Sequence, residues 1–142
     1  INIINDILDL EKIGSGNIEF ENVPFNIVDA LKTNIKLFSV TAEAKNVAMH
    51  FNNQASNELF VLGDPTRFSQ IVNNLLSNAV KFTAKGTITI HLQTKNIGNN
   101  KAEIQVSVTD TGIGIDENKL IKIFQPFTQA YPETARKYGG TG

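Results

Sequence analysis

Two asparagines one helical turn apart, with a lysine close behind, are residues whose types and spacing could do chemistry. Asn74, Asn78 and Lys81 lie in the stretch NNLLSNAVKF. At about 100° per residue, the three side chains fall on one flank of a largely apolar helix. An amide oxygen can ligate Mg²⁺ alongside substrate phosphates, and an ammonium can meet a phosphate as a point charge. The spacing therefore suits a metal-bound polyphosphate, and the alternative is an ordinary solvated flank of a core helix.

A carboxylate and two glycines form the second candidate. Apolar and polar residues alternate over 104–108, so a period of two predicts that Asp110 points inward with the apolar set. Gly112 and Gly114 leave room for a ligand, and a carboxylate there could accept a hydrogen bond from an exocyclic amine such as that of adenine. The alternative is an Asp-Thr-Gly turn whose carboxylate bonds its own backbone. An aspartic-protease site is disfavoured because a second such carboxylate is missing.

The third candidate follows the second along the chain. Phe124, Pro126 and Phe127 form a compact apolar group, and a polar segment with Arg136 and Lys137 then leads into GGTG. An apolar anchor followed by a polar, glycine-bounded segment is what a mobile lid over a ligand needs. A plain surface loop is the alternative.

The first half of the chain must supply elements that position these residues. Apolar residues at helical spacing in 1–10, stopped by Gly-Ser-Gly, predict the tail of a longer helix, with a frayed terminal helix as the alternative. The stretch NIEFENV predicts a short strand ended by Pro24. Asn26 then predicts the N-cap of a helix that runs to about Ala44.

The second half predicts strands around the asparagine helix. VAMHF and LFVLG are expected strands, and Asp64 followed by Pro65 predicts the helix start. TITIHLQTK, opened by Gly86, turns at GNN into AEIQVSVTD. The apolar stripe of the helix is expected to face the core with Phe68, Ile71, Val72, Leu75, Leu76, Ala79 and Phe82. We therefore predict an α+β, two-layer sandwich with a mixed, mostly antiparallel sheet covered by helices on one face.

Bulk composition narrows the classes of function. The 142 residues are 41% hydrophobic, which favours one core, and a net charge of -1 disfavours nucleic-acid binding. The absence of cysteine excludes disulfides, thiolate zinc sites and a cysteine nucleophile. No apolar run approaches the roughly 20 residues of a membrane span. We expect a cytoplasmic domain, which a membrane-anchored protein could also carry.

Four stretches, in this order, resemble the motifs of the catalytic ATP-binding domain of sensor histidine kinases, within the Bergerat-fold superfamily of ATPases and kinases. NNLLSNAVKFT resembles the family's asparagine box, DTGIGI its first glycine box, FQPF its phenylalanine box and GGTG the start of its second glycine box. Residues 1–16 resemble the end of the dimerisation and histidine-phosphotransfer helix, especially in hybrid-type kinases. The resemblance implies an ATP-binding domain over 17–142 whose closing helix and strand would lie beyond Gly142.

The resemblance also implies a role for each matching residue. Asn78 would ligate Mg²⁺ with Asn74 assisting, and Lys81 and Phe82 would lie near the phosphates of ATP. Asp110 would bind the adenine amino group. Gly112 and Gly114 would shape the adenine pocket, and Gly140 and Gly142 would form the hinge of the lid. The nucleotide-binding set it implies is Asn74, Asn78, Lys81, Phe82, Asp110, Gly112, Gly114, Ile115, Arg136, Lys137, Gly140, Thr141 and Gly142.

One position departs from the pattern of many family members. Gln129 stands where those members have an arginine after the phenylalanine box. A phosphate contact from that position is therefore in doubt, and Arg136 or Lys137 would have to compensate.

Asn74 distinguishes transfer from hydrolysis. Hydrolysing branches of the superfamily place a glutamate four residues before the metal asparagine, and an amide cannot replace it as a base near neutral pH. The γ-phosphoryl group is then expected to pass to a histidine on an upstream dimerisation domain in a homodimer, and onward to a response regulator receiver domain. His50 and His91 lie in predicted strands and do not match that acceptor, so this chain alone should not autophosphorylate. The alternative is a catalytically inactive ATP-binding or dimeric signalling module.

Overall fold

The structure is a computed structural model, which describes residues 11, 14, 19–99, 101–121 and 123. These residues belong to two compact units. One unit, Glu21–Ile113, contains every described strand and both long helices. The other comprises Ile1–Phe20 and Gly114–Gly142, and its described helix is the short α4 (Glu117–Leu120).

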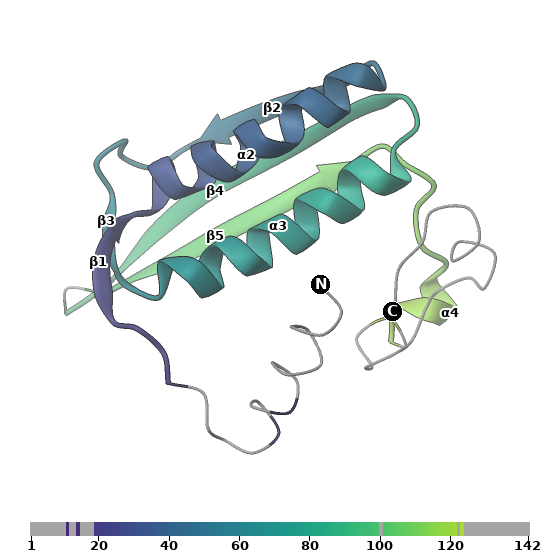
Figure 1. Ribbon diagram of the computed structural model, residues 1–142. Helices are drawn as coiled ribbons and strands as arrows, with labels where there is room; N and C mark the ends of the chain where they lie inside the picture. The colour runs from purple at the N-terminus through teal and green to yellow at the C-terminus, as the bar shows by residue number, and fades with distance from the viewer. Residues whose placement is uncertain (1–10, 12–13, 15–18, 100, 122, 124–142) are drawn as a thin grey trace. The chain divides into compact units, whose positions relative to one another are not determined.

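The larger unit is a two-layer sandwich of helices on a sheet. In the main sheet, β2 pairs in parallel with β4, which pairs antiparallel with β5, while β1 and β3 form a separate antiparallel pair. Figure 1 shows α2 and α3 side by side on one face of the main sheet. The elements are β1 (Val23–Asn26), α2 (Ile27–Ala44), β2 (Val47–Asn53), β3 (Phe60–Gly63), α3 (Pro65–Phe82), β4 (Gly86–Gly98) and β5 (Lys101–Asp110). The predicted α+β sandwich with a mixed sheet is confirmed.

Both long helices begin at the predicted caps. Asn26 Oδ1 accepts hydrogen bonds from the backbone N–H groups of the second and third residues of α2, at 2.9 and 3.3 Å. Asp64 Oδ1 does the same for α3, at 3.0 and 2.9 Å, and Pro65 occupies the first helical position. These bonds satisfy backbone donors that a helix start otherwise leaves without partners.

The core lies between the two helices and β4. Strand β4 contributes the most deeply buried strand residues, whereas the corresponding residues of β5 (Ile104, Val106 and Val108) are half-buried. Side chains with almost no exposure include Val28, Leu31, Val72, Leu76, Ile88, Ile90 and Leu92. The sheet is therefore most completely covered along β4.

The buried face of α3 differs from the predicted stripe. Ile71 and Leu75 are 62% and 43% exposed, whereas Val80, outside that stripe, is buried. The reason is the position of α2, which meets α3 through a hydrogen bond of 3.3 Å from Asn34 Nδ2 to Ser69 Oγ. Since Ser69 and Val80 are eleven residues apart, they lie on the same side of the helix. Contact with α2 thus turns the buried face of α3 away from Ile71 and Leu75.

The first strand also lies elsewhere than predicted. Of the stretch 17–23, the structure describes residues from 19 on, and residues 19–22 form no strand. Strand β1 instead includes Pro24, which lies opposite Leu62 of β3. Among the described residues β1 pairs on one side only, so proline's missing N–H costs no ladder bond on the free side.

The remaining predicted elements have mixed outcomes. The GNN turn between β4 and β5 is confirmed, with Gly98 and Asn99 at φ of +83° and +53°. Of the helix predicted to stop at Gly-Ser-Gly, the structure describes Glu11 and Gly14, both helical, so the helix includes the first glycine of the predicted stop. Residues 1–10 lie outside the described residues. In the part of the chain that the structure describes, no helix combines the length and apolar character that crossing a membrane requires.

Candidate functional site

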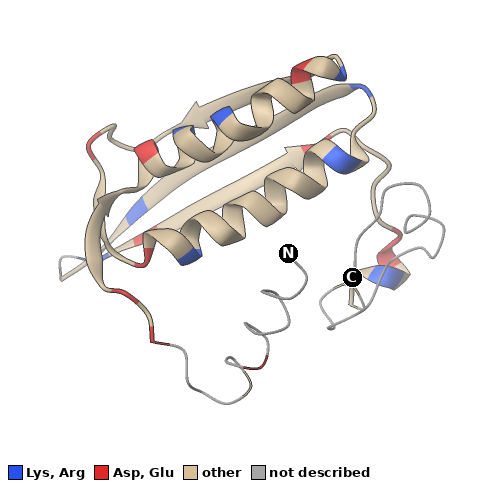
Figure 2. Cartoon of the chain, viewed as in Figure 1, with Lys and Arg blue, Asp and Glu red and all other residues tan. Residues whose placement is uncertain are grey.

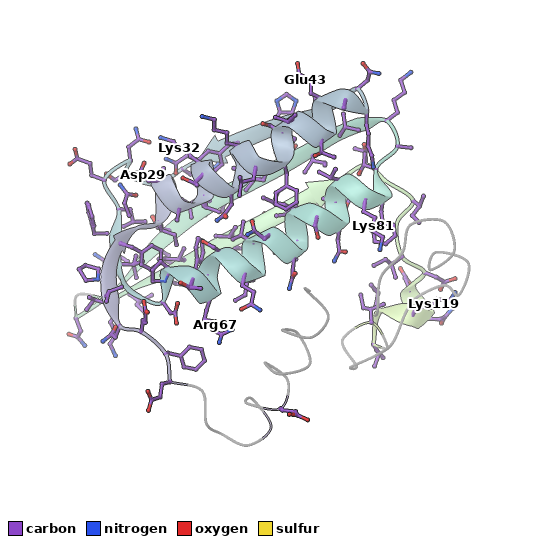
Figure 3. All side chains as sticks on the ribbon, in the orientation of Figure 1. Asp29, Lys32, Glu43, Arg67, Lys81 and Lys119 are labelled. Carbon is purple, nitrogen blue, oxygen red and sulfur yellow. The ribbon has the colours of Figure 1, made fainter. Side chains whose placement is uncertain are left out.

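The flank of α3 that carries the asparagines is open. Asn74 and Asn78 are exposed, and neither side-chain amide has a hydrogen-bond partner in the described part of the chain. Lys81 lies at the C-terminal end of α3, as Figure 3 shows, with Nζ 5.0 Å from the centroid of the Phe82 ring. An exposed amide oxygen with no competing donor is a suitable ligand for a hard cation such as Mg²⁺.

The carboxylate of Asp110 lies at the predicted face but not at the predicted depth. Asp110 is opposite Ile88 in the β4–β5 register, so the two residues share a face of the sheet. Ile88 is buried, yet Asp110 is exposed, and its Oδ1 accepts a hydrogen bond of 2.8 Å from Gly112 N. The prediction of a buried carboxylate was wrong because Asp110 ends β5, where the following turn supplies its donor. The alternative, an Asp-Thr-Gly turn bonded to its own backbone, is the one observed.

Gly112 brings this turn against the end of α3. A Cβ atom at Gly112 would lie 2.5 Å from the carbonyl oxygen of Phe82 and 2.7 Å from Asp110 Oδ1. Real Cβ atoms do not approach other atoms so closely, so a glycine is required by lack of space rather than by backbone conformation. The contact places the end of the asparagine helix and the acidic turn side by side.

A second contact fastens the same turn to the start of β4. Thr111 N donates to Thr87 O at 3.1 Å, and Thr87 N donates to Thr111 Oγ1 at 3.0 Å. Gly86, at φ of +121°, faces Thr111 Oγ1 so closely that a side chain would collide with it. This arrangement was not predicted from the sequence, although the glycine that opens β4 was a visible signal of it.

The other predicted site residues fall outside this unit or outside the described residues. Gly114 adopts φ of +68°, a conformation that favours glycine, and Ile115 is exposed. Asp116, which follows them, caps α4, a helix that sequence analysis did not predict. The phenylalanine box and Gln129 lie outside the described residues, as do Arg136, Lys137, Gly140, Thr141 and Gly142.

The carboxyl group at the start of α3 has a lowered pKa. The hydrogen bond from the backbone N–H of Arg67 is the main reason that the pKa of the Asp64 carboxyl lies below its ordinary value of 3.8. Desolvation, the next largest effect, raises this pKa, and further bonds from Glu21 N and Thr66 N lower it. Among the described residues, no group of three His, Cys, Asp or Glu side chains could hold a metal ion.

A sandwich that presents exposed amides, a lysine and an acidic turn at one end of a helix has the features of a nucleotide-binding domain. Comparison with known families agrees with that class. Residues 63–142, more than half of the chain, match the family of histidine kinase-, DNA gyrase B- and HSP90-like ATPases. The chain belongs to this family.

Similar proteins are sensor kinases. The chain is 38% identical over 140 residues to the signal transduction histidine-protein kinase BarA of Escherichia coli, matching 99% of this chain and 15% of that protein. It is 41% identical over 142 residues to histidine protein kinase 1 of Candida albicans, matching all of this chain and 6% of that protein. The chain thus spans a small part of the length of these relatives.

Solved structures share the fold. Full-length ShkA in complex with AMPPNP matches 90% of this chain and 27% of its own, with a TM-score of 0.78 and 28% identity. The catalytic domain of histidine kinase ThkA matches 82% of this chain and 72% of its own, with a TM-score of 0.64 and 26% identity.

Proposed function

We propose that this chain binds Mg-ATP and donates the γ-phosphoryl group to a histidine on an upstream dimerisation domain, in two-component signal transduction. The observation that carries the proposal is the meeting of two motifs at Gly112. There the C-terminal end of α3 contacts the turn that presents Asp110. Membership of the ATPase family and similarity to histidine kinases support the same activity.

Each motif has a distinct task in this proposal. Asn78, exposed and without a competing partner among the described residues, provides the metal ligand, and Asn74 assists one turn earlier. Bound Mg²⁺ would neutralise charge on the phosphates. Lys81 contacts a phosphate, and Asp110 accepts a hydrogen bond from the adenine amino group. Because a carboxylate can accept several hydrogen bonds, Asp110 can accept this one while its Oδ1 keeps the bond from Gly112 N.

The pocket and lid complete the proposed site. Gly112 and Gly114 border the adenine. The lid would contain Arg136 and Lys137, of which at least one replaces the arginine that Gln129 does not supply. Its hinge would lie at the second glycine box, with Gly140, Thr141 and Gly142.

Transfer is favoured over hydrolysis at position 74. Water attack needs a base, and the amide of Asn74 cannot take up a proton near neutral pH. Phosphoryl transfer depends mainly on positioning and charge neutralisation, so this domain can hold the nucleotide while another domain provides the nucleophile.

The proposed context is a larger hybrid-type kinase. Residues 1–16 would end the dimerisation helix and 17–142 would form the ATP-binding domain, cytoplasmic and carried by a membrane-anchored sensor in a homodimer. A response regulator receiver domain is the expected later partner. In support, a solved structure holds ThkA, 26% identical to this chain, in complex with the response regulator protein TrrA.

Two measurements test the proposal. Titration calorimetry of the chain with Mg-ATP should give a saturable heat, and its absence at millimolar nucleotide would exclude ATP binding. Adding a matching dimerisation domain should then give ATP-dependent phosphohistidine. Binding without transfer would favour the second candidate, an inactive ATP-binding or dimeric signalling module, for which Gln129 is the motivating residue.

A further inference from the structure

The C-terminal end of α3 is an unfavourable place for a polyphosphate. A helix carries partial positive charge at its N-terminus and partial negative charge at its C-terminus, so anions are normally bound at the opposite end. In the proposed site, however, Asn78 and Lys81 lie in the last turns of α3. A positive charge at this end of α3 would offset the partial negative charge of its last carbonyl groups.

A lysine from α2 contacts one of these carbonyl groups. Lys45 Nζ donates a hydrogen bond of 2.8 Å to Val80 O, across 35 residues of sequence. The carbonyl groups of the last turn have no partner within the helix, so a cation that reaches one of them both satisfies and neutralises it. Figure 2 shows basic residues at the C-terminal ends of both α2 and α3.

The base of this lysine is held in place. Lys45 is the C-cap residue of α2, and its backbone N–H donates to Ala42 O at 3.0 Å. Asn46 then adopts φ of +57°, which turns the chain directly into the buried Val47 of β2. The side chain of this exposed residue therefore starts from a defined point at the end of α2 and reaches the end of the neighbouring helix.

We propose that Lys45 is a positioning residue of the nucleotide site. Its ammonium fixes the last turn of α3, which carries Lys81 and follows Asn78, and it offsets the negative end of the helix that the phosphates of ATP approach. The inference rests on the proposed function and adds a residue outside the four sequence motifs. Because Lys45 acts on the phosphate side, its loss should weaken ATP and spare a ligand without phosphates.

The test compares Mg-ATP with adenosine on the same chain. Lys45→Met keeps most of the apolar stem and removes the donor and the charge, and we expect about a fivefold rise in the Kd of Mg-ATP with little change for adenosine. Lys45→Arg should restore the wild-type Kd. Lys36→Met, which removes an exposed lysine from α2, is the matched control and should leave both constants unchanged.

Each result of this test either supports or contradicts the role proposed for Lys45. An unchanged Kd of Mg-ATP in Lys45→Met, or equal weakening of ATP and adenosine, would overturn the inference, since the second result means that Lys45 only supports the fold. If Lys45→Met fails to fold, Lys45→Gln, which keeps a neutral donor, carries the same expectation. Wild-type chain that binds no Mg-ATP would instead overturn the proposed function and this inference with it.

Discussion

Helices α2 and α3 have the same length and similar N-caps, but their asparagine side chains make different contacts. Each has 18 residues and begins at an Asn or Asp N-cap. In α2, Asn34 is 4% exposed and donates to Ala30 O and Ser69 Oγ. In α3, Asn74 and Asn78 are exposed, with no side-chain partner among the described residues. The same side chain joins two helices in one place and faces outward in the other.

The contrast in burial and hydrogen bonding separates an amide that joins two helices from amides that have no partner among the described residues. Asparagine is a mediocre helix former, so an interaction made by its side chain within a helix helps to offset that cost. Asn34 has that interaction inside the protein. Asn74 and Asn78 have no such partner among the described residues, and in the proposed function their partners are the metal and the phosphates of ATP.

Asn78→Ala should give a large loss of affinity for Mg-ATP and the clearest separation of the two helices. Loss of the metal ligand should weaken Mg-ATP by roughly 10- to 100-fold. Because Asn78 is exposed, the free energy of unfolding should stay within about 0.5 kcal/mol of wild type. Calorimetry and urea denaturation measure the two quantities. Ser77→Ala is the neighbouring control, and equal Kd values for Asn78→Ala and wild type would remove Asn78 from the site.

Asp110→Asn extends the comparison to the turn that α3 contacts. The substitution keeps the shape of the side chain and removes a charge-assisted hydrogen bond to adenine, which should weaken ATP by roughly 1.5 to 3 kcal/mol. Adenosine should lose a similar amount, since the bond is to the base. Unchanged dissociation constants for both ligands would place the adenine elsewhere.

Asn34→Ala should have the opposite signature to Asn78→Ala. It removes a buried amide and leaves Ser69 Oγ without this donor, so we expect a loss of about 1 to 3 kcal/mol in the free energy of unfolding. Nucleotide affinity of the folded protein should not change. Urea denaturation measures the loss, and the double variant with Ser69→Ala should be non-additive because the two side chains interact. Weaker ATP binding in folded Asn34→Ala would break the distinction between the helices.

Thr83→Val tests a buried polar group at the end of α3. Thr83 has no exposed surface, and its Oγ1 has no hydrogen-bond partner in the described structure. Replacing an unsatisfied hydroxyl by a methyl group of the same shape should stabilise the fold by about 1 kcal/mol or leave it unchanged. A clear fall in thermal unfolding temperature would show that the hydroxyl has a partner in solution.

Lowering the pH should destabilise the start of α3 more than the start of α2. This is the smallest of the effects that we expect. The pKa of Asp64 is lowered in the folded state, chiefly by the Arg67 N–H, so its stabilising effect is complete above the ordinary value of 3.8 and is lost as pH falls through the folded value. Asn26, the cap of α2, does not titrate. Thermal unfolding of Asp64→Asn should therefore depend less on pH below about 4 than that of wild type. Parallel curves for the two proteins would contradict this assignment.

Local features of the fold could be predicted from sequence, and features that depend on neighbours could not. The caps at Asn26 and Asp64 are set by residues within one turn, and both were predicted correctly. The rotation of α3 that exposes Ile71 and Leu75 depends on where α2 packs, which a projection of one helix cannot contain. The inclusion of Pro24 in a strand likewise depends on its partner, β3.

The site shows the same division. The spacing of residues in the sequence correctly predicted which flank of α3 carries the asparagines and on which face of the sheet Asp110 lies. The exposure of Asp110 could not be predicted from its position in the strand. It depends on the turn that follows, in which Gly112 N donates a hydrogen bond to the carboxylate. Lys45 gave no signal in sequence because its contact with Val80 O joins the ends of two helices.

The connection between β2 and β4 has a mechanical consequence for α3. These strands are parallel neighbours, and the chain that links them passes through β3 and α3. The helix is thus joined to strands at both ends, and a large displacement of α3 would also strain its connections to β3 and β4. In the proposed function, α3 would therefore hold the metal-binding amides in place while nucleotide enters or leaves.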